Sequence, residues 1–161
     1  MNGPRLSNDR DSRTVLSTVL QACVLIGAAA LTVWAIDTAV AERLSRAGGR
    51  SLPSPAEWTA LCRRVHVRLI GPAFVSVAAA LIASAYLHDD RWQVGAALMI
   101  GAICYTWDRI RPAGEVLYAI DPTRPGTLHL TRARFRTYAL SHYPLIGLGL
   151  SALVAFAWAH S

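Results

Sequence analysis

The sequence predicts an all-α integral membrane protein, a four-transmembrane-helix bundle with a long third loop. Two observations predict this fold class. Apolar stretches occur at about residues 15–36, 69–87, 92–107 and 138–159, and most arginines lie in the first and third of the loops that divide them. A helix needs roughly 20 apolar residues to cross a hydrocarbon core of about 30 Å. Lipid offers an open backbone no hydrogen-bond partners, so each stretch is predicted to be helical.

Composition agrees with this fold class and excludes others. Hydrophobic residues make up 53% of the 161 residues, against a usual value of about 45–50%, and their clustering into long runs separates a membrane protein from a soluble one. The length suits one domain, residues 1–161, and not two. A soluble domain that binds nucleic acid would carry its arginines on amphipathic helices. We therefore expect the lipid bilayer as a partner and no nucleic acid.

The first predicted helix, about residues 15–36, follows a basic N-terminal segment. Together with Ala39-Val40-Ala41 after it, this arrangement resembles a secretory signal with a small-residue cleavage site. The apolar run is longer than the core of a signal usually is, and Asp37 lies just before the site. We therefore expect a retained helix, with cleavage as the alternative.

The second predicted helix, about residues 55–87, starts before the membrane. Its first residues, Ser54-Pro55-Ala56-Glu57, form a capping box with proline at the first helical position. Pro72 lies inside the helix and should kink it, because proline removes a backbone hydrogen bond and clashes with the preceding turn.

The third and fourth helices are predicted at about residues 92–107 and 138–159. The third must be an antiparallel neighbour of the second, because residues 88–91 allow only a tight turn. Pro144 should kink the fourth helix near its start, as Pro72 kinks the second. Two helices kinked at the same face would leave a cavity between them, although proline is also common in membrane helices.

Small residues four positions apart predict the packing faces, because they let two backbones approach closely. They are Ser76, Ala80 and Ser84 on the second helix, Ala97 and Gly101 on the third, and Gly147 and Ser151 on the fourth. We expect these faces inside the bundle rather than at a dimer contact.

The third loop, about residues 108–137, is long for a connector. Residues 121–126 have the composition of a turn, and the segment from Glu115 to Ile120 is predicted to form a short interfacial helix. Long loops are often functional. The loop is therefore interpreted either as a lid over a cavity or as a plain membrane-surface segment.

All 16 basic residues are arginine, and their distribution predicts the topology. The first loop and its helix entry carry Arg43, Arg46, Arg50, Arg63, Arg64 and Arg68; the third loop carries Arg109, Arg111, Arg124, Arg132, Arg134 and Arg136. Short cytoplasmic loops keep positive charge, so loops one and three should be cytoplasmic and both termini outside, in a plasma membrane that we take to be bacterial. The basic side either meets anionic lipid or an acidic substrate, or only sets topology.

The cysteines and the spacing of metal-ligand residues predict no metal and no thiol chemistry. Cys23, Cys62 and Cys104 are scattered, without a C-x-x-C pair, so thiol–disulfide exchange has no candidate. No H-x-x-x-H pattern occurs either. We therefore expect no cofactor.

Polar and aromatic residues gather at the predicted cytoplasmic ends of the helices. His66 and His142 belong to the ends of parallel helices, so they could share a depth, and histidine accepts and returns a proton near neutral pH. Near them the sequence places Trp107, Arg109, Arg111, Tyr138 and Tyr143. The set would supply a base, cations and aromatic walls; the alternative is that its members are interfacial anchors.

Three short motifs in this chain resemble motifs of the anthrone oxygenase family. The members of that family are small four-helix membrane proteins. Thr106-Trp107 with Pro112 and Leu117 resembles that family's T-W-x-x-x-x-P-T-N-x-x-L, and residues 141–147, SHYPLIG, resemble its R-S-L-F-P-L-x-G. Trp58, then His66, then Pro72 is similar to its second-helix pattern. The family's asparagine, tryptophan, histidine and arginine are replaced here by Gly114, Phe135, Thr137 and Leu140.

The resemblance implies oxidation of a hydrophobic phenolic polycycle by dioxygen, without metal or flavin. On this interpretation His66 is the first candidate for the base and His142 the second. Arg109 and Arg111 would stabilise the enolate, and the rings of Trp58, Trp107, Tyr138 and Tyr143 would bind the substrate. Two alternatives stay open: a non-catalytic accessory protein that assembles with a membrane partner, and haem ligation by His66 and His142.

Overall fold

The computed structural model describes residues 5–46, 55–120 and 126–160, and of these the side chains of residues 5–13, 42, 45–46, 55–70, 118 and 127–128 are left aside. Throughout this part of the chain the structure is helical, with no strand. The elements are α1 (Arg5–Arg46), α2 (Pro55–Leu87), α3 (Arg91–Tyr105), the π-helical η1 (Thr106–Ile110), α4 (Arg111–Tyr118), α5 (Thr127–Leu140) and α6 (His142–His160).

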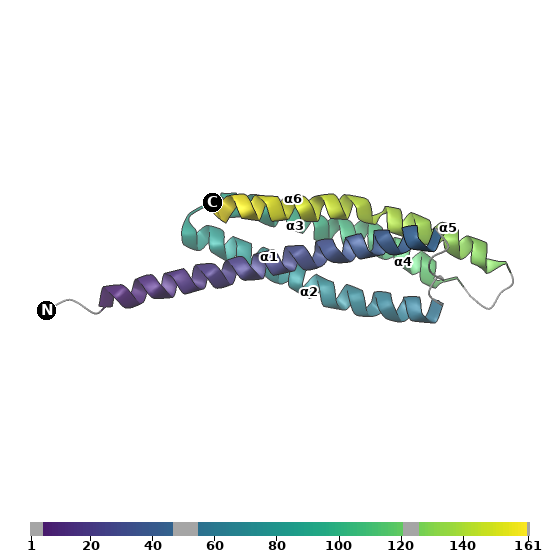
Figure 1. The fold of residues 1–161 in the computed structure, drawn as a ribbon, viewed down its shortest axis with the longest axis horizontal. Coiled ribbons are helices and arrows are strands. Elements are labelled where there is room, and N and C mark those ends of the chain that lie inside the picture. Colours follow the sequence, from purple (N-terminus) through teal and green to yellow (C-terminus); the bar gives the residue numbers. More distant parts are fainter. Residues whose placement is uncertain (1–4, 47–54, 121–125, 161) are drawn as a thin grey trace.

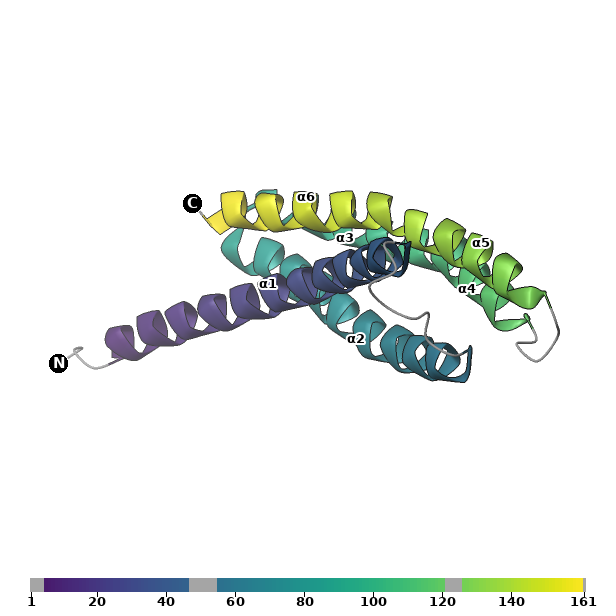
Figure 2. The same ribbon diagram turned by 45° about the vertical axis from the view of Figure 1, so that its right-hand side comes forward.

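The ring that forms the bundle consists of α1, α2, α3 and α6 (Figure 1): α1 contacts α2 and α6, and α3 contacts α2 and α6. The second view shows that α5 continues the direction of α6 past one end of this ring, with α4 beside it (Figure 2). The start of α1 extends past the opposite end. Helix α1 ends and α2 begins at the end of the ring that holds α4 and α5, whereas the α2–α3 turn lies at the opposite end (Figure 1).

Two described segments are long and apolar enough to cross a membrane. They are Thr14–Ala41, with 28 residues, and His129–His160, with 32 residues; the apolar part of α2, Gly71–Leu87, is shorter. Helix α3 has only 15 residues, which at 1.5 Å per residue cover about 22 Å. Two spans among the described residues thus meet the length criterion, against the four predicted.

Very close contacts between glycine and its neighbours hold the ring together. A Cβ on Gly27 of α1 would collide with the Pro72 carbonyl oxygen and would lie 2.6 Å from the Ser76 Cβ of α2. In the same way, the Phe156 ring occupies the space that a Cβ on Gly95 of α3 would need. The Thr32 side chain occupies the corresponding space at Gly149 of α6. Beside the first contact, the Ser76 hydroxyl donates a hydrogen bond of 2.8 Å to the Val24 carbonyl. Small residues therefore bring these backbones close together.

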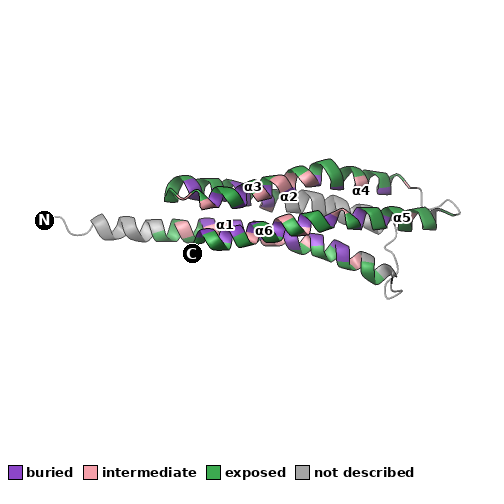
Figure 3. Cartoon of the chain, turned by 90° about the horizontal axis from the view of Figure 1, so that it is seen from above, coloured by how far each residue is buried: buried purple, intermediate pink, exposed green. Residues whose placement is uncertain are grey.

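Buried residues alternate with exposed ones along α1, α3 and α6 (Figure 3), and each of these helices has a buried stripe. On α2, Ser76, Ala80 and Ser84 are buried, as predicted. The prediction for α3 and α6 was wrong. Ala97 and Ser151 are exposed, and Gly101 and Gly147 have open space where a Cβ would be. A spacing of four residues defines a helical face but does not say which face is buried. The buried faces run instead through Gly95, Met99, Gly149 and Ala152.

The segment predicted as the third loop is largely helical. Helix α3 continues through the π-helical η1 into α4, and Pro112, the second residue of α4, follows this π-helical turn. The predicted short helix at residues 115–120 is therefore present, but it starts earlier and ends at Tyr118. Helix α5 was missed, because its arginines hide it from a search for apolar runs. Of the predicted turn, only Gly126 lies within the described residues. It directly precedes the first residue of α5 and has a φ of 87°.

The kink predicted at Pro144 takes the form of a break between two helices. Helix α5 ends at Leu140, Ser141 separates the two, and α6 begins at His142. Pro144 is thus the third residue of α6, where its missing N–H leaves no helical hydrogen bond unmade. Pro72, in contrast, lies inside the uninterrupted helix α2.

Candidate functional site

His142 is the most deeply buried ionisable group among the described side chains, with an exposed fraction of 0%. It lies between two aromatic rings from other helices, Trp34 of α1 and Tyr138 of α5. The His142 and Trp34 ring centroids are 4.9 Å apart at 76°, and those of His142 and Tyr138 are 4.7 Å apart at 64°. Both are edge-to-face contacts, which aromatic rings favour. We call Trp34, Tyr138 and His142 the histidine cluster.

The break between α5 and α6 fixes the state of this histidine. The last carbonyls of a helix lack backbone partners, and here the Tyr138 carbonyl oxygen lies 2.8 Å from His142 Nδ1 and 2.6 Å from the Ser141 hydroxyl. A carbonyl oxygen only accepts, so both groups donate to it. Nδ1 therefore carries the hydrogen, and in the neutral ring the basic lone pair lies on Nε2.

Tyr143, the next residue, lies at the surface. Its side chain is 40% exposed. Arg43 of α1 donates from Nε to the Tyr143 hydroxyl at 3.1 Å, and its guanidinium carbon lies 5.9 Å from the ring centroid. This contact joins the end of α1 to the start of α6. Of the two tyrosines predicted as substrate walls, Tyr138 thus contacts His142 and Tyr143 is held outside by Arg43.

The predicted cations Arg109 and Arg111 lie in exposed ion pairs. Arg109 Nε is 3.1 Å from Asp108 Oδ2, and Arg111 Nε is 2.9 Å from Glu115 Oε1. The Arg111 guanidinium also lies 4.5 Å from the ring centroid of Trp107, which is 59% exposed. These residues form one surface group on η1 and α4. Their charges are already balanced by their own helix.

Two predicted site residues, His66 and Trp58, belong to the part of α2 whose side chains lie outside the described residues. The prediction that His66 lies near Trp107 and Tyr143 therefore falls outside them as well. Among the described candidates, the structure brings His142 and Tyr138 together. It separates them from the surface group of Trp107, Arg109 and Arg111.

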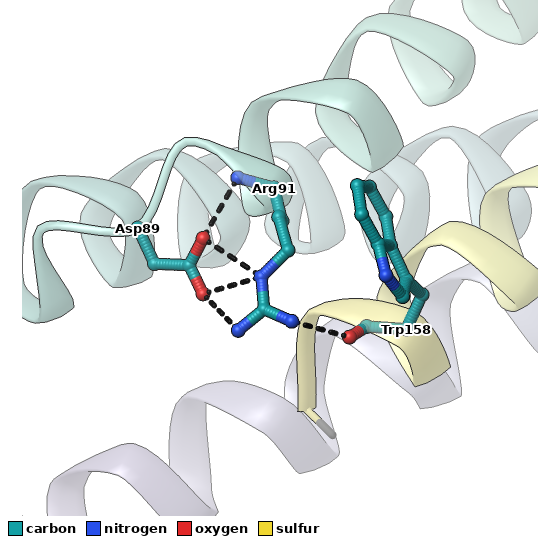
Figure 4. A network of polar contacts seen from close by, with 3 residues as sticks. All are labelled: Asp89, Arg91 and Trp158. Carbon is teal, nitrogen blue, oxygen red and sulfur yellow. Dashed lines mark hydrogen bonds and ion pairs between the residues drawn. The ribbon is translucent and has the colours of Figure 1, made fainter.

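A second polar arrangement lies at the opposite end of the ring, where α2 turns into α3 (Figure 4). Asp89 accepts hydrogen bonds from the backbone N–H and the guanidinium of Arg91, at 3.0 and 3.1 Å for Oδ1. Arg91 also donates to the Trp158 carbonyl near the end of α6 at 3.1 Å, with its guanidinium 5.6 Å from the Trp158 ring. A cation is favourable at a helix C-terminus. We call these three residues the turn clamp.

The turn clamp shifts two ionisation equilibria. Hydrogen bonds from the side chain and then from the backbone of Arg91 lower the pKa of Asp89 below its ordinary value. The same side-chain hydrogen bond raises the pKa of Arg91. Both groups are therefore charged across the physiological range.

Sequence reasoning missed Trp34, Arg43 and the turn clamp. Trp34 is a single aromatic ring within an apolar run, and only the packing of α1 on α6 makes it a neighbour of His142. The turn clamp had a local signal, an aspartate two residues before an arginine at a helix start. Its partner on α6 depends on the tertiary fold.

Within the described ranges, no group of three or more histidine, cysteine or acidic side chains is placed to hold a metal ion. Cys23 and Cys104 carry free thiols. Comparisons of the chain with protein-family models, with characterised proteins and with solved structures found no match.

Proposed function

We propose that the chain is an integral membrane protein, crossed by at least α1 and the α5–α6 segment. The length and apolarity of these helices support it, and so does their outer surface. Large apolar side chains are exposed along it, among them Ile26 at 67%, Val33 at 64% and Val154 at 69%. A helix on the surface of a soluble bundle carries polar residues on that face, whereas a helix in lipid exposes apolar ones.

Within this membrane protein we propose a cofactor-independent oxygenase, with His142 as the base. The observation that carries the proposal is the hydrogen bond from Nδ1 to the Tyr138 carbonyl, since it leaves Nε2 as the proton acceptor beside two aromatic rings. The motif resemblance supplies the substrate class, a phenolic polycycle of the anthrone type. Its apolar rings suit a site reached from the bilayer.

The reaction balances without a cofactor. Nε2 takes a C–H proton from the CH₂ carbon, and the electron pair left on that carbon forms a C–O bond with dioxygen. The imidazolium then returns its proton to the terminal peroxide oxygen. Loss of the second hydrogen and cleavage of the O–O bond release water, so that CH₂ and O₂ become C=O and H₂O. General base catalysis of the first step contributes about 100- to 10,000-fold.

Access to the base requires a movement of side chains. Nε2 is buried, Tyr138 is buried, and Trp34 is only half-buried. Displacement of the Trp34 ring between α1 and α6 is therefore the route that we propose for the substrate. Arg109 and Arg111 have no place in this scheme, because their ion pairs hold them at the surface.

The separation of the predicted residues favours a second candidate, a non-catalytic accessory protein. Arg109 and Arg111 are held in ion pairs at the surface, so neither is placed to stabilise an enolate at His142. In that case the histidine cluster only fixes the angle between α5 and α6, and the protein acts by assembling with a membrane partner.

Oxygen uptake by the purified protein in nanodiscs with an anthrone substrate tests the proposal, after subtraction of the uncatalysed rate. The oxygenase predicts uptake that falls at least about 100-fold in His142→Ala. His129→Ala, an exposed histidine on α5, is the matched control and should keep full activity. Equal activity of both variants removes His142 as the base. Inert protein that co-purifies with a partner indicates the accessory role, and a Soret band indicates haem.

A further inference from the structure

The arginines of α5 differ from those of η1 and α4 at the same end of the ring. Arg132, Arg134 and Arg136 have exposed side chains, and none of them has an ion-pair partner in the described part of the chain. Arg109 and Arg111, by contrast, are already paired with acidic side chains. Helix α5 has no acidic residue of its own. Among the described residues, helix α5 therefore presents three charges that have no acidic partner.

The helical register places two of these charges together. Arg132 and Arg136 are one turn apart and share one side of α5, while Arg134 lies on the other side of the buried residues Phe135 and Tyr138. Like charges at this spacing repel each other. Between the two sides, the outward ridge is uncharged, formed by Ala133, Thr137 and Leu140.

The length of α6 sets the depth of these charges, an argument that rests on the proposed membrane span. The 19 residues of α6 cover about 28 Å, close to the hydrocarbon core of about 30 Å. Helix α6 thus forms the part of the α5–α6 segment inside the core, and α5 extends outward from it, with Leu140 at the edge of the core. At 1.5 Å per residue, Arg136 lies about 9 Å and Arg132 about 15 Å beyond His142. The headgroup layer extends roughly 5–8 Å beyond the core on each side, within reach of both side chains.

We propose that Arg132 and Arg136 bind the phosphate of an anionic phospholipid. The phosphate bridges the two guanidinium groups and removes their repulsion, since guanidinium binds phosphate oxygens in a bidentate manner. The acyl chains run from this phosphate towards α6, past Leu140, while the arginine stems lie along the uncharged ridge. Charge complementarity and the depth of the two arginines favour a lipid over an acidic protein as the occupant.

Native mass spectrometry of the full chain in detergent, titrated with phosphatidylglycerol or phosphatidylcholine, tests the proposal. Each basic residue near an anionic surface contributes about fivefold in affinity. Arg132→Gln/Arg136→Gln should therefore lose about 30-fold of the preference for phosphatidylglycerol. Arg109→Gln/Arg111→Gln is the matched control, and it should change the preference by less than about twofold because these charges are already paired.

Three results overturn the proposal: a preference retained by Arg132→Gln/Arg136→Gln, equal affinity for the two lipids in the wild type, or inorganic phosphate competing as well as the lipid. If the double variant does not fold, the wild type alone still decides, because a lipid phosphate site must weaken as ionic strength rises. Carbonate extraction of cell membranes separates this inference from the proposed membrane location. Protein that stays in the pellet but shows no lipid preference refutes the inference only, whereas release into the supernatant refutes the span.

Discussion

Gly27→Ala is expected to push α1 and α2 apart. The new Cβ would lie 2.6 Å from the Ser76 Cβ and would collide with the Pro72 carbonyl, a backbone atom that no rotamer change can move. Carbon atoms in contact need about 3.5–4.0 Å, so the helices must separate by about 1 Å. The hydrogen bond from Ser76 to the Val24 carbonyl, now 2.8 Å, then stretches to roughly 3.8 Å and is lost.

The free energies give the size of this effect. Overpacking costs about 1–3 kcal/mol and the lost interhelical hydrogen bond about 1 kcal/mol, while alanine gains about 1 kcal/mol over glycine in helix propensity. The net loss is about 1–3 kcal/mol. For a chain of this size each kcal/mol lowers Tm by roughly 2–4 °C, so a decrease of about 6 °C is expected near the middle of the range.

Thermal unfolding followed by circular dichroism in one detergent measures the decrease. Gly147→Ala is the matched control, since a Cβ there meets open space, and it should leave Tm unchanged or slightly higher. Ser76→Ala isolates the hydrogen bond and should lower Tm by only part of the full effect. If Gly27→Ala unfolds at the temperature of Gly147→Ala, the close contact between α1 and α2 does not exist as described.

Three further predictions concern the turn clamp and the topology. Arg91→Ala removes the cation at the end of α6, so amide hydrogen exchange near Trp158 should become faster while exchange in the middle of α6 stays unchanged. Arg91 lowers the pKa of Asp89 below its ordinary 3.8. The stability from this pair should therefore be constant above pH about 4 and decrease as the pH falls towards the lowered pKa, and the Tm difference between wild type and Asp89→Asn should shrink there. An impermeant thiol reagent on intact cells should label Ser161→Cys and not Ser51→Cys; the reverse pattern would invert the topology predicted from twelve arginines against four.

The parts of the fold that follow from local chemistry were predictable. Helix α2 spans the range expected from the capping box at Pro55 and the turn after Leu87. Helix α1 extends well beyond the apolar run at residues 15–36, because a helix continues through polar residues that an apolarity criterion rejects. Helix α5 was hidden by the same criterion. Which face of α3 and α6 is buried depends on the neighbouring helices, and a spacing pattern on one helix carries no information about them.

The candidate site was predictable only in its residue types. His142 and Tyr138 are four residues apart, a spacing that brings two side chains close together on a helix. The burial of His142, and its contact with Trp34, depend on how α1 packs against the break between α5 and α6. Arg109 and Arg111 were predicted at the end of the bundle where the structure places them. Their acidic partners, Asp108 and Glu115, lie within four residues in the sequence, and that local competition decides where these cations point.

The order of the four helices along the chain also sets the order in which the helix–helix contacts of the ring form during synthesis. Helix α1 leaves the ribosome first, and α6, one of its two neighbours in the ring, leaves last. Between Trp34 and His142 roughly 100 residues must be translated, which at about 5–20 residues per second takes about 5–20 s. For that time the contacts of α1 with α6, among them the close approach of Thr32 to Gly149, cannot form. The arrival of Gly149 closes the ring, because it completes the contact between α1 and α6.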